Sequence, residues 1–359
     1  MIVSGKGGSA VEDAELVSKA MGRALALAER GRGRVEPNPM VGATLLRDGE
    51  IVAQGYHQKH GEGHAEVNAL ADAKAKGIDP RGLTMCVTLE PCSHYGKTPP
   101  CSKALIDAGI KRVVIAMQDP YHEVAGRGIA MLRDAGIEVE LGVMEAEAKR
   151  LNEPFIKRVT TGLPWVIVKW AQTLDGKTAT ASCHSQWISN EASRERVHQI
   201  RGRMDAVMVG VGTAIADDPS LTARPKSDKH ILRVARRLVV DRSGRLPTDA
   251  KMLHDDGPPV SVLKGDLREE LKQLASEGVT NILVEGGATL VGALLQQKLV
   301  DQILVFTAPK LVGDAAALPA VQGMVCETMD DALELSLIGV ERLGDDVLLD
   351  YRVNASENL

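Results

Sequence analysis

Four residues in the first third of the chain have the types and the spacing of a hydrolytic zinc site: His64, Glu66, Cys92 and Cys101. One imidazole and two thiolates suit tetrahedral Zn²⁺ and leave a fourth position for water. The metal lowers the pKa of bound water to about 7, so hydroxide forms at neutral pH. Hydrolytic removal of an amino group from a ring carbon also needs a proton carrier. Glu66, two residues from a ligand, is placed to be this general acid and base.

The elements expected around these residues would support the metal. His64 follows a loop with Gly61 and Gly63 and stands where we expect a helix to start. Pro91-Cys92 follows a predicted strand, where we expect another helix to begin; a helix N-terminus stabilises a thiolate. Zinc deaminases carry H-x-E followed by P-C-x-x-C. This chain keeps the first half and the Pro-Cys, but residues 93–100 separate its two cysteines.

Two other interpretations of these residues stay open. The cysteines could simply be buried apolar side chains. The zinc could instead be structural, with a fourth protein ligand such as His57, His60 or His94. A His-x-Glu after a glycine loop, together with Leu-Glu-Pro-Cys after a strand, favours the catalytic interpretation.

Charge and aromatic content favour a small-molecule substrate over a polynucleotide. The formal net charge is −5, and only 3% of the residues are aromatic. Residues 1–150 hold 19 Lys and Arg against 20 Asp and Glu, and residues 151–359 hold 24 against 28. Nucleic-acid binders normally show a basic face and often stacking aromatics. We therefore expect no nucleic-acid partner.

Length and cysteine content indicate a multidomain protein of the cytoplasm. The 359 residues suffice for two or three domains, and 44% are hydrophobic. The five cysteines argue against a disulfide framework, because their number is odd and we find no secretory signal in residues 1–10. No apolar run is long enough to span a bilayer, so we expect no membrane association. A homo-oligomer is compatible with the sequence.

Hydrophobic periodicity predicts two α/β domains. A helix over 11–30 and a hairpin of strands 40–46 and 51–56 precede alternating helices and strands up to residue 141. We place a zinc domain at 11–150, a linker at 151–163 and a second domain at 164–359. Strands of the second domain are predicted at 165–170, 206–209, 237–241, 260–263, 281–284 and 302–307, with late strands within 332–351. Its helices are predicted at 191–200, 267–275 and from about 288 to 297.

Glycines near the end of the second domain predict a phosphate site. Gly286-Gly287 joins a strand to an apolar helix, so a phosphate could approach the backbone and the unpaired N–H groups of the helix. Such turns are also common without a ligand. Gly210-Val211-Gly212 is a fragment of G-x-G-x-x-G without a third glycine, which does not support a doubly wound NAD fold.

The motifs of the first half match a known family closely. Gly63-His64-Ala65-Glu66, Thr88-Leu89-Glu90-Pro91-Cys92-Ser93-His94 and Gly96-Lys97-Thr98-Pro99-Pro100-Cys101 resemble the bifunctional riboflavin-biosynthesis deaminase/reductase family of bacteria. The long spacing between the cysteines is that family's own form. The resemblance implies substrate contacts by Asn38, His57, Lys97, Thr98 and Asp119, with Lys97 and Thr98 facing a phosphate. The chain departs from the family at Tyr121-His122, where Asn-Pro is usual, so that contact is not carried over.

The second half resembles the same family. The matching segments are Lys169–Lys177, Ser185–Ile188 and Thr213–Pro219, with Leu221-Thr222 and Arg224. For the first domain the resemblance implies a cytidine-deaminase-like α/β/α fold. For the second it implies a dihydrofolate-reductase-like α/β fold that uses NADPH. By residue, it implies NADPH contacts by Ala171, Trp187, Thr213, Asp217, Ser243, Gly287, Ala288, Thr289, Leu290, Val291, Gly292 and Ala293. It implies substrate contacts by Ser185, Arg201, Leu221, Arg224 and Glu285.

The resemblance implies two consecutive reactions on a small phosphorylated pyrimidine. The first would deaminate 2,5-diamino-6-(5-phosphoribosylamino)pyrimidin-4-one with zinc. The second would reduce the ribosyl group of 5-amino-6-(5-phosphoribosylamino)uracil to ribityl with NADPH. A nucleic-acid deaminase with an accessory domain and a binding protein with a structural zinc are the alternatives. Loss of ammonia release with zinc retained in Glu66→Gln separates catalytic from structural zinc.

Overall fold

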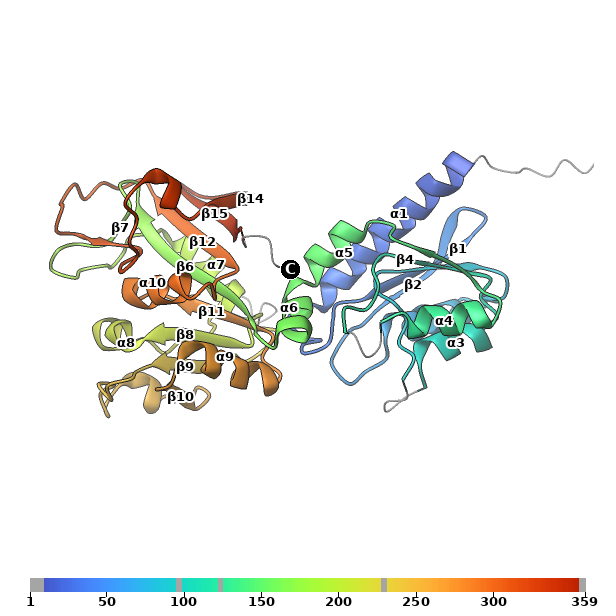
Figure 1. Ribbon diagram of the computed structural model, residues 1–359, viewed down its shortest axis with the longest axis horizontal. Helices are drawn as coiled ribbons and strands as arrows, with labels where there is room; N and C mark the ends of the chain where they lie inside the picture. Colours follow the sequence, from blue (N-terminus) through green and yellow to red (C-terminus); the bar gives the residue numbers. More distant parts are fainter. Residues whose placement is uncertain (1–9, 95–98, 122–124, 227–230, 355–359) are drawn as a thin grey trace, which may run out of the picture. The chain divides into compact units, whose positions relative to one another are not determined.

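The chain folds into two compact units, described here one at a time. The computed structural model describes residues 10–94, 99–121, 125–226 and 231–354 (Figure 1). The first unit ends at Thr161 and the second begins at Gly162. Residues 151–163, expected as a linker, contain helix α6 (Glu153–Thr161) of the first unit. Pro154 is compatible with this helix because it lies in the first turn, where a backbone N–H has no partner to lose.

A five-stranded mixed sheet forms the centre of the first unit, in the order β2-β1-β3-β4-β5. The predicted hairpin is β1 (Gly42–Arg47) with β2 (Glu50–Tyr56), and β1 also pairs antiparallel with β3 (Thr84–Val87). Strands β4 (Arg112–Ile115) and β5 (Glu138–Leu141) continue the sheet in parallel. The carboxyl end of β3 therefore lies beside that of β4, and the chain leaves it toward Cys92.

Alternate residues of these strands enter two different cores, so helices must cover both faces. Met85 and Val87 pack with α2 (Ala65–Ala75), α3 (Cys101–Asp107) and α4 (Arg127–Asp134). Cys86 packs on the other face with α1 (Ala10–Ala28) and α5 (Glu145–Leu151). A short 3₁₀ turn, η1 (Glu29–Gly31), follows α1. The expected α/β/α sandwich is confirmed, as Figure 1 shows.

An eight-stranded sheet forms the second unit, in the order β10-β9-β8-β11-β6-β12-β15-β14. All neighbours from β10 to β12 are parallel, and β15 and β14 add an antiparallel edge. The strands are β6 (Trp165–Thr173), β8 (Ala206–Gly210), β9 (Arg236–Val240), β10 (Val260–Leu263), β11 (Asn281–Glu285), β12 (Gln302–Ala308), β14 (Leu335–Leu343) and β15 (Asp346–Val353). A separate ribbon pairs β7 (Lys177–Ala179) with β13 (Leu318–Pro319).

Helices cover this sheet on both faces as well. Helices α9 (Leu267–Ser276) and α10 (Ala288–Gln296) pack on Val166, Val168 and Val284. Helices α7 (Glu191–Arg201) and α8 (Val211–Asp217) pack on the opposite face through two smaller clusters. The short turns η3 (Lys251–Leu253) and η4 (Met329–Asp331) lie in the connections. The carboxyl ends of β6, β8 and β11 thus meet the start of α8 and of α10.

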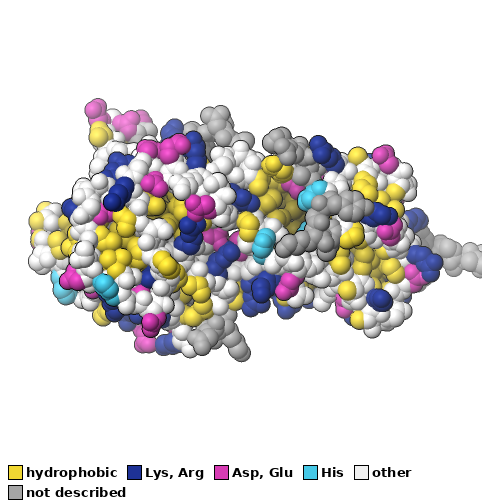
Figure 2. Space-filling view, turned by 90° about the horizontal axis from the view of Figure 1, so that it is seen from below, with side chains coloured by type: hydrophobic (Ala, Val, Ile, Leu, Met, Phe, Trp, Pro, Cys, Tyr) yellow, Lys and Arg dark blue, Asp and Glu magenta, His cyan; other side chains and the backbone are white. Residues whose placement is uncertain are grey.

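The surface agrees with the balanced composition. On the face shown in Figure 2, basic and acidic side chains are interspersed over both units. Within the described residues, no helix is long and apolar enough to cross a membrane.

Candidate active sites

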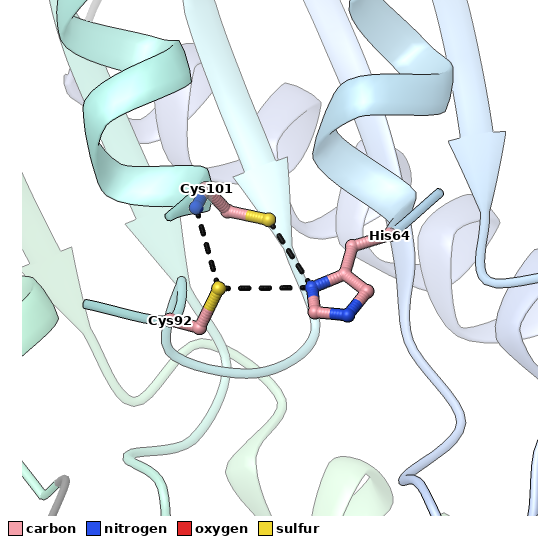
Figure 3. A group of neighbouring side chains, drawn as sticks. All are labelled: His64, Cys92 and Cys101. Carbon is pink, nitrogen blue, oxygen red and sulfur yellow. Dashed lines mark hydrogen bonds between the residues drawn. The ribbon is translucent and has the colours of Figure 1, made fainter. Parts of the chain in front are cut away.

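The three predicted zinc ligands converge in the first unit from three separate segments. His64 is the residue before α2, Cys92 lies in the loop after β3, and Cys101 is the first residue of α3. The His64 Nδ1 atom lies 3.3 Å from Cys101 Sγ and 3.7 Å from Cys92 Sγ (Figure 3). Tetrahedral zinc with Zn–N of about 2.0 Å and Zn–S of about 2.3 Å requires N···S separations of about 3.5 Å. The donor set fits zinc in type and in spacing.

The local structure around Cys92 differs from the prediction in one respect. We expected a helix to begin at Pro91-Cys92, but Cys92 lies in a loop and the helix begins at Cys101. The Cys101 backbone N–H nevertheless donates to Cys92 Sγ at 3.3 Å, so an amide of that helix start does contact the Cys92 sulfur. Hydrogen bonds with the Cys101 thiol above all, with His64 and with this backbone N–H lower the pKa of Cys92. A lowered pKa favours the thiolate, the form that binds zinc.

Glu66 lies beside the ligands on the first turn of α2. Its side chain is buried, and burial together with the Cys92 thiolate raises its pKa to about 7. A carboxyl group with a pKa near the working pH can both accept and return a proton. The position and the environment of Glu66 suit the predicted general acid and base.

His57 belongs to the wall of this site. Its Nε2 lies 3.2 Å from Asn38 Nδ2, and its Nδ1 lies 3.1 Å from the Gly63 carbonyl oxygen. Its ring packs edge-on against the His64 ring, with 5.3 Å between centroids. In the described part of the chain, His64, Cys92 and Cys101 are the only group of three or more His, Cys, Asp or Glu residues whose ligand atoms all lie within 4.8 Å of one another. A structural zinc held by His57 as fourth ligand is not favoured.

Glu90 ties the Cys92 segment to the region after β4. Its buried carboxylate accepts the backbone N–H groups of Asp119, Gly126, Gly128 and Ile129 at 2.9 to 3.2 Å. It therefore holds the start of α4 and the predicted substrate residue Asp119 against the zinc loop. Nothing in the sequence patterns marked this role. The predicted residues Lys97 and Thr98, and His122 of the departing motif, lie outside the described residues.

The second unit contains a cavity of about 730 Å³ at the carboxyl ends of β6 and β11. Most of the residues predicted for NADPH or substrate line it: Ala171, Ser185, Trp187, Arg201, Thr213, Asp217, Leu221, Arg224, Glu285, Gly287, Ala288, Thr289 and Val291. The lining does not include Ser243, Leu290, Gly292 or Ala293. The backbone of Gly287 has φ +85° before the first turn of α10, a conformation that favours glycine.

A buried ion pair marks the floor of the cavity. Arg201 donates to both carboxylate oxygens of Glu285, at 2.7 Å from Nη2 to Oε2, and Lys169 Nζ lies 3.5 Å from Oε2. Lys169 is the register partner of Glu285 on the neighbouring parallel strand. Burial opposes the charge, but Arg201 and Lys169 outweigh it and lower the pKa of Glu285 to about 2. The sequence motif Lys169–Lys177 includes Lys169 but does not mark it as a site residue.

Helix α7 supplies two further lining residues that we did not predict. Arg194 lies 4.6 Å above the centre of the Trp187 ring and donates to the Ser189 carbonyl oxygen at 2.7 Å. His198 accepts the backbone N–H of Arg224 on its Nδ1, at 3.2 Å. Both line the cavity together with Arg201. The spacing of 194, 198 and 201 is that of one helical face, which was a usable signal.

Comparisons with known proteins cover both units. Residues 14–117 match the family model of the cytidine and deoxycytidylate deaminase zinc-binding region, and residues 164–349 match the RibD C-terminal domain. The riboflavin biosynthesis protein RibD of Escherichia coli is 42% identical, over 92% of this chain and 97% of its own length. The RibD protein of Aquifex aeolicus is 39% identical, over 94% of this chain and 99% of its own length.

Solved structures agree over the same span. Acinetobacter baumannii RibD superposes with a TM-score of 0.87 at 37% identity, covering 95% of this chain and 100% of the other. A diaminohydroxyphosphoribosylaminopyrimidine deaminase/5-amino-6-(5-phosphoribosylamino)uracil reductase of Thermotoga maritima gives a TM-score of 0.86 at 36% identity. It covers 95% of this chain and 99% of the other.

Proposed function

Because the chain belongs to the RibD family of riboflavin biosynthesis proteins, we propose that it performs two consecutive reactions on one phosphorylated pyrimidine. It is a bifunctional deaminase and reductase, with zinc and NADPH as cofactors. The first unit has a cytidine-deaminase-like fold and the second a dihydrofolate-reductase-like fold, as expected. The first unit deaminates 2,5-diamino-6-(5-phosphoribosylamino)pyrimidin-4-one. The second reduces the ribosyl group of 5-amino-6-(5-phosphoribosylamino)uracil to ribityl.

The deaminase proposal depends on one observation: His64, Cys92 and Cys101 converge beside the buried Glu66. Zinc held by the three ligands lowers the pKa of water to about 7. With zinc bound, Glu66 would accept one proton from the water on a carboxylate oxygen and pass it to the ring nitrogen. It would then accept the second proton, from the hydroxyl group left on the ring carbon, and pass it to the amino group, which leaves as ammonia. Asn38, His57 and Asp119 orient the pyrimidine, and Lys97 and Thr98 bind its phosphate.

The reductase proposal places both ligands in the cavity of the second unit. NADPH supplies the hydride, and the protein orients the two reactants. Ala171, Trp187, Thr213, Asp217 and residues 287–293 bind NADPH, and Ser243 is proposed with them on the resemblance alone. Ser185, Leu221, Arg224 and the Arg201–Glu285 pair bind the sugar phosphate.

The test follows both reactions in one sample. Zinc-replete protein is given the diaminopyrimidine phosphate, and ammonia release and then NADPH absorbance are measured. We expect ammonia to appear first and NADPH to be consumed in equal amount. Absence of NADPH oxidation after deamination would overturn the reductase proposal.

A Glu66→Gln variant tests the catalytic role of the zinc site. Gln keeps the shape of the side chain but cannot carry the proton, so we expect ammonia release to fall by about 10²-fold or more. Bound zinc, measured by elemental analysis, should stay at the wild-type level. The assignment is contradicted if the variant loses zinc or unfolds but its folded molecules release ammonia as fast as wild type.

A further inference from the structure

One face of α7 holds the segment that follows α8. Arg201 Nη1 donates to the Thr222 carbonyl oxygen at 3.2 Å, and the Arg224 N–H donates to His198 Nδ1 at 3.2 Å. The Lys226 N–H donates to both carboxylate oxygens of Glu195 at 3.0 Å. Three successive turns of the helix thus bind three alternate residues of the segment.

The middle one of these three contacts, between His198 and Arg224, involves the titratable imidazole of His198. We propose that His198 is a positioning residue of the reductase site, whose imidazole fixes the backbone of Arg224 and so places the Arg224 side chain at the cavity. The inference depends on the proposed reductase function of the second unit. Nδ1 accepts a hydrogen bond, so the ring is neutral and its proton resides on Nε2.

Of the three arginines that line the cavity near α7, Arg224 depends most on a fixed backbone to place its side chain. The guanidinium of Arg201 is committed to Glu285 and Thr222, and that of Arg194 to Trp187 and Ser189. Among the described residues, the Arg224 guanidinium has no hydrogen bond or ion pair, and its side chain is exposed while still lining the cavity. Binding a phosphate costs a long exposed side chain its rotamer freedom, and a backbone that is already held avoids the additional entropy cost of ordering the main chain.

The charges around His198 keep it neutral. Burial, followed by the positive charges of Arg201 and Arg224, lowers its pKa, while Glu285 and Glu195 act in the opposite direction. Protonation would place an Nδ1–H against the Arg224 N–H and break the contact. The sugar-phosphate affinity should therefore fall as the pH drops through the lowered pKa of His198, below its usual 6.5.

Two amide variants separate the two ring nitrogens. His198→Asn places an amide oxygen near the position of Nδ1 and keeps an acceptor for the Arg224 N–H. His198→Gln reaches the position of Nε2 and loses that acceptor. We expect His198→Gln to raise KM for the aminouracil phosphate about three- to tenfold, the worth of one hydrogen bond. His198→Asn should stay within about twofold of wild type, and KM for NADPH should not change in either variant.

Two internal controls keep this test interpretable. An unchanged KM for NADPH reports a folded second unit in every variant, and ammonia release by the first unit of the same molecule normalises the amount of protein. The substrate phosphate itself titrates near pH 6. This titration affects wild type and His198→Asn equally, so only the difference between their pH profiles reports the titration of His198. The wild type should show an extra acid limb in kcat/KM that His198→Asn lacks.

The outcomes distinguish this inference from the proposed function. If wild type does not oxidise NADPH with the aminouracil phosphate, the reductase function itself fails. If wild type is active and His198→Gln keeps its KM within about twofold, the positioning role is wrong. Equal damage in His198→Asn and His198→Gln would also overturn it, because it would show that Nε2 or the ring volume matters rather than the Nδ1 contact.

Discussion

At the scale of single residues, the buried Glu285 carboxylate lies between the side chains of Arg201 and Lys169, and its negative charge compensates both positive charges. Removing one partner of a buried ion pair leaves the other charge without compensation. Arg201 is the partner most affected, because two of its three donating nitrogens, Nε and Nη2, donate to the carboxylate. Glu285 therefore supports the stability of the second unit as well as the proposed substrate site.

A Glu285→Gln variant should lower the free energy of unfolding of the second unit by about 3 kcal/mol. It should also abolish the reductase reaction and leave ammonia release unchanged. Urea unfolding followed by tryptophan fluorescence measures the first effect, because all three tryptophans, Trp165, Trp170 and Trp187, are in the second unit. Glu341→Gln is the matched control: its pair with Arg196 is largely exposed, and we expect a change within about 0.5 kcal/mol.

The pH dependence of this contribution has a definite sign. The pKa of Glu285 is about 2 in the folded protein against 4.5 for the free group. Its contribution is fully present above about pH 4.5 and is lost as the pH falls toward 2. The stability difference between wild type and Glu285→Gln, measured by urea unfolding at several pH values, should thus shrink over that interval. A difference that grows on acidification would contradict the ionised pair.

At the scale of elements, the close approach of α4 to the zinc loop sets the position of a ligand. A Cβ atom added to Gly128 would lie 2.0 Å from the Pro91 carbonyl oxygen, one residue before Cys92. Gly128 also donates its N–H to Glu90. Helix and loop can be this close only where no side chain intervenes.

A Gly128→Ala variant should therefore displace Pro91-Cys92 and weaken zinc binding. We expect at least a tenfold loss of zinc affinity, similar to the loss of a residue that orients a ligand. Competition with a chromogenic chelator measures it. Gly22→Ala in α1 is the matched control, since its added Cβ would meet only Met144 Sδ at 3.9 Å. That variant should keep zinc affinity and gain about 0.5–1 kcal/mol of stability. Equal zinc affinity in both variants would rule out the packing argument.

Most elements were predictable because their sequence patterns are local. The hairpin around Asp48-Gly49, the amphipathic α1 and the strand-turn-helix at Gly286-Gly287 follow from spacing and turn residues. The predictions failed where contacts between residues far apart in the sequence determine the local structure. Residues 153–161 form a helix despite Pro154, and the loop at Cys92 is held by Glu90 through groups far away in sequence.

The zinc ligands were predictable for a different reason: few chemistries need one histidine, two cysteines and a nearby glutamate. The floor of the second cavity was only partly predictable. Glu285 and Lys169 meet because β11 and β6 pair in parallel register, which no local pattern reveals. His198 was detectable from its helical spacing to Arg201, but its contact with Arg224 depends on the path of the intervening chain.

At the scale of the whole molecule, the two units keep separate cores. The clusters around Met85 and Cys86 belong to the first unit, and those around Val166, Ile167 and Val207 belong to the second. In the described residues, no core cluster combines side chains of both units. A perturbation confined to one core should therefore leave the other unit folded.

Zinc removal tests this independence directly. Treatment with a strong chelator should stop ammonia release, because Glu66 alone does not lower the pKa of water. NADPH oxidation should continue when the aminouracil phosphate is supplied, since His64, Cys92 and Cys101 all belong to the first unit. Added zinc should restore ammonia release without changing the reductase rate. Parallel loss and recovery of both activities would show instead that the metal supports both units, and the separate cores would then not act independently.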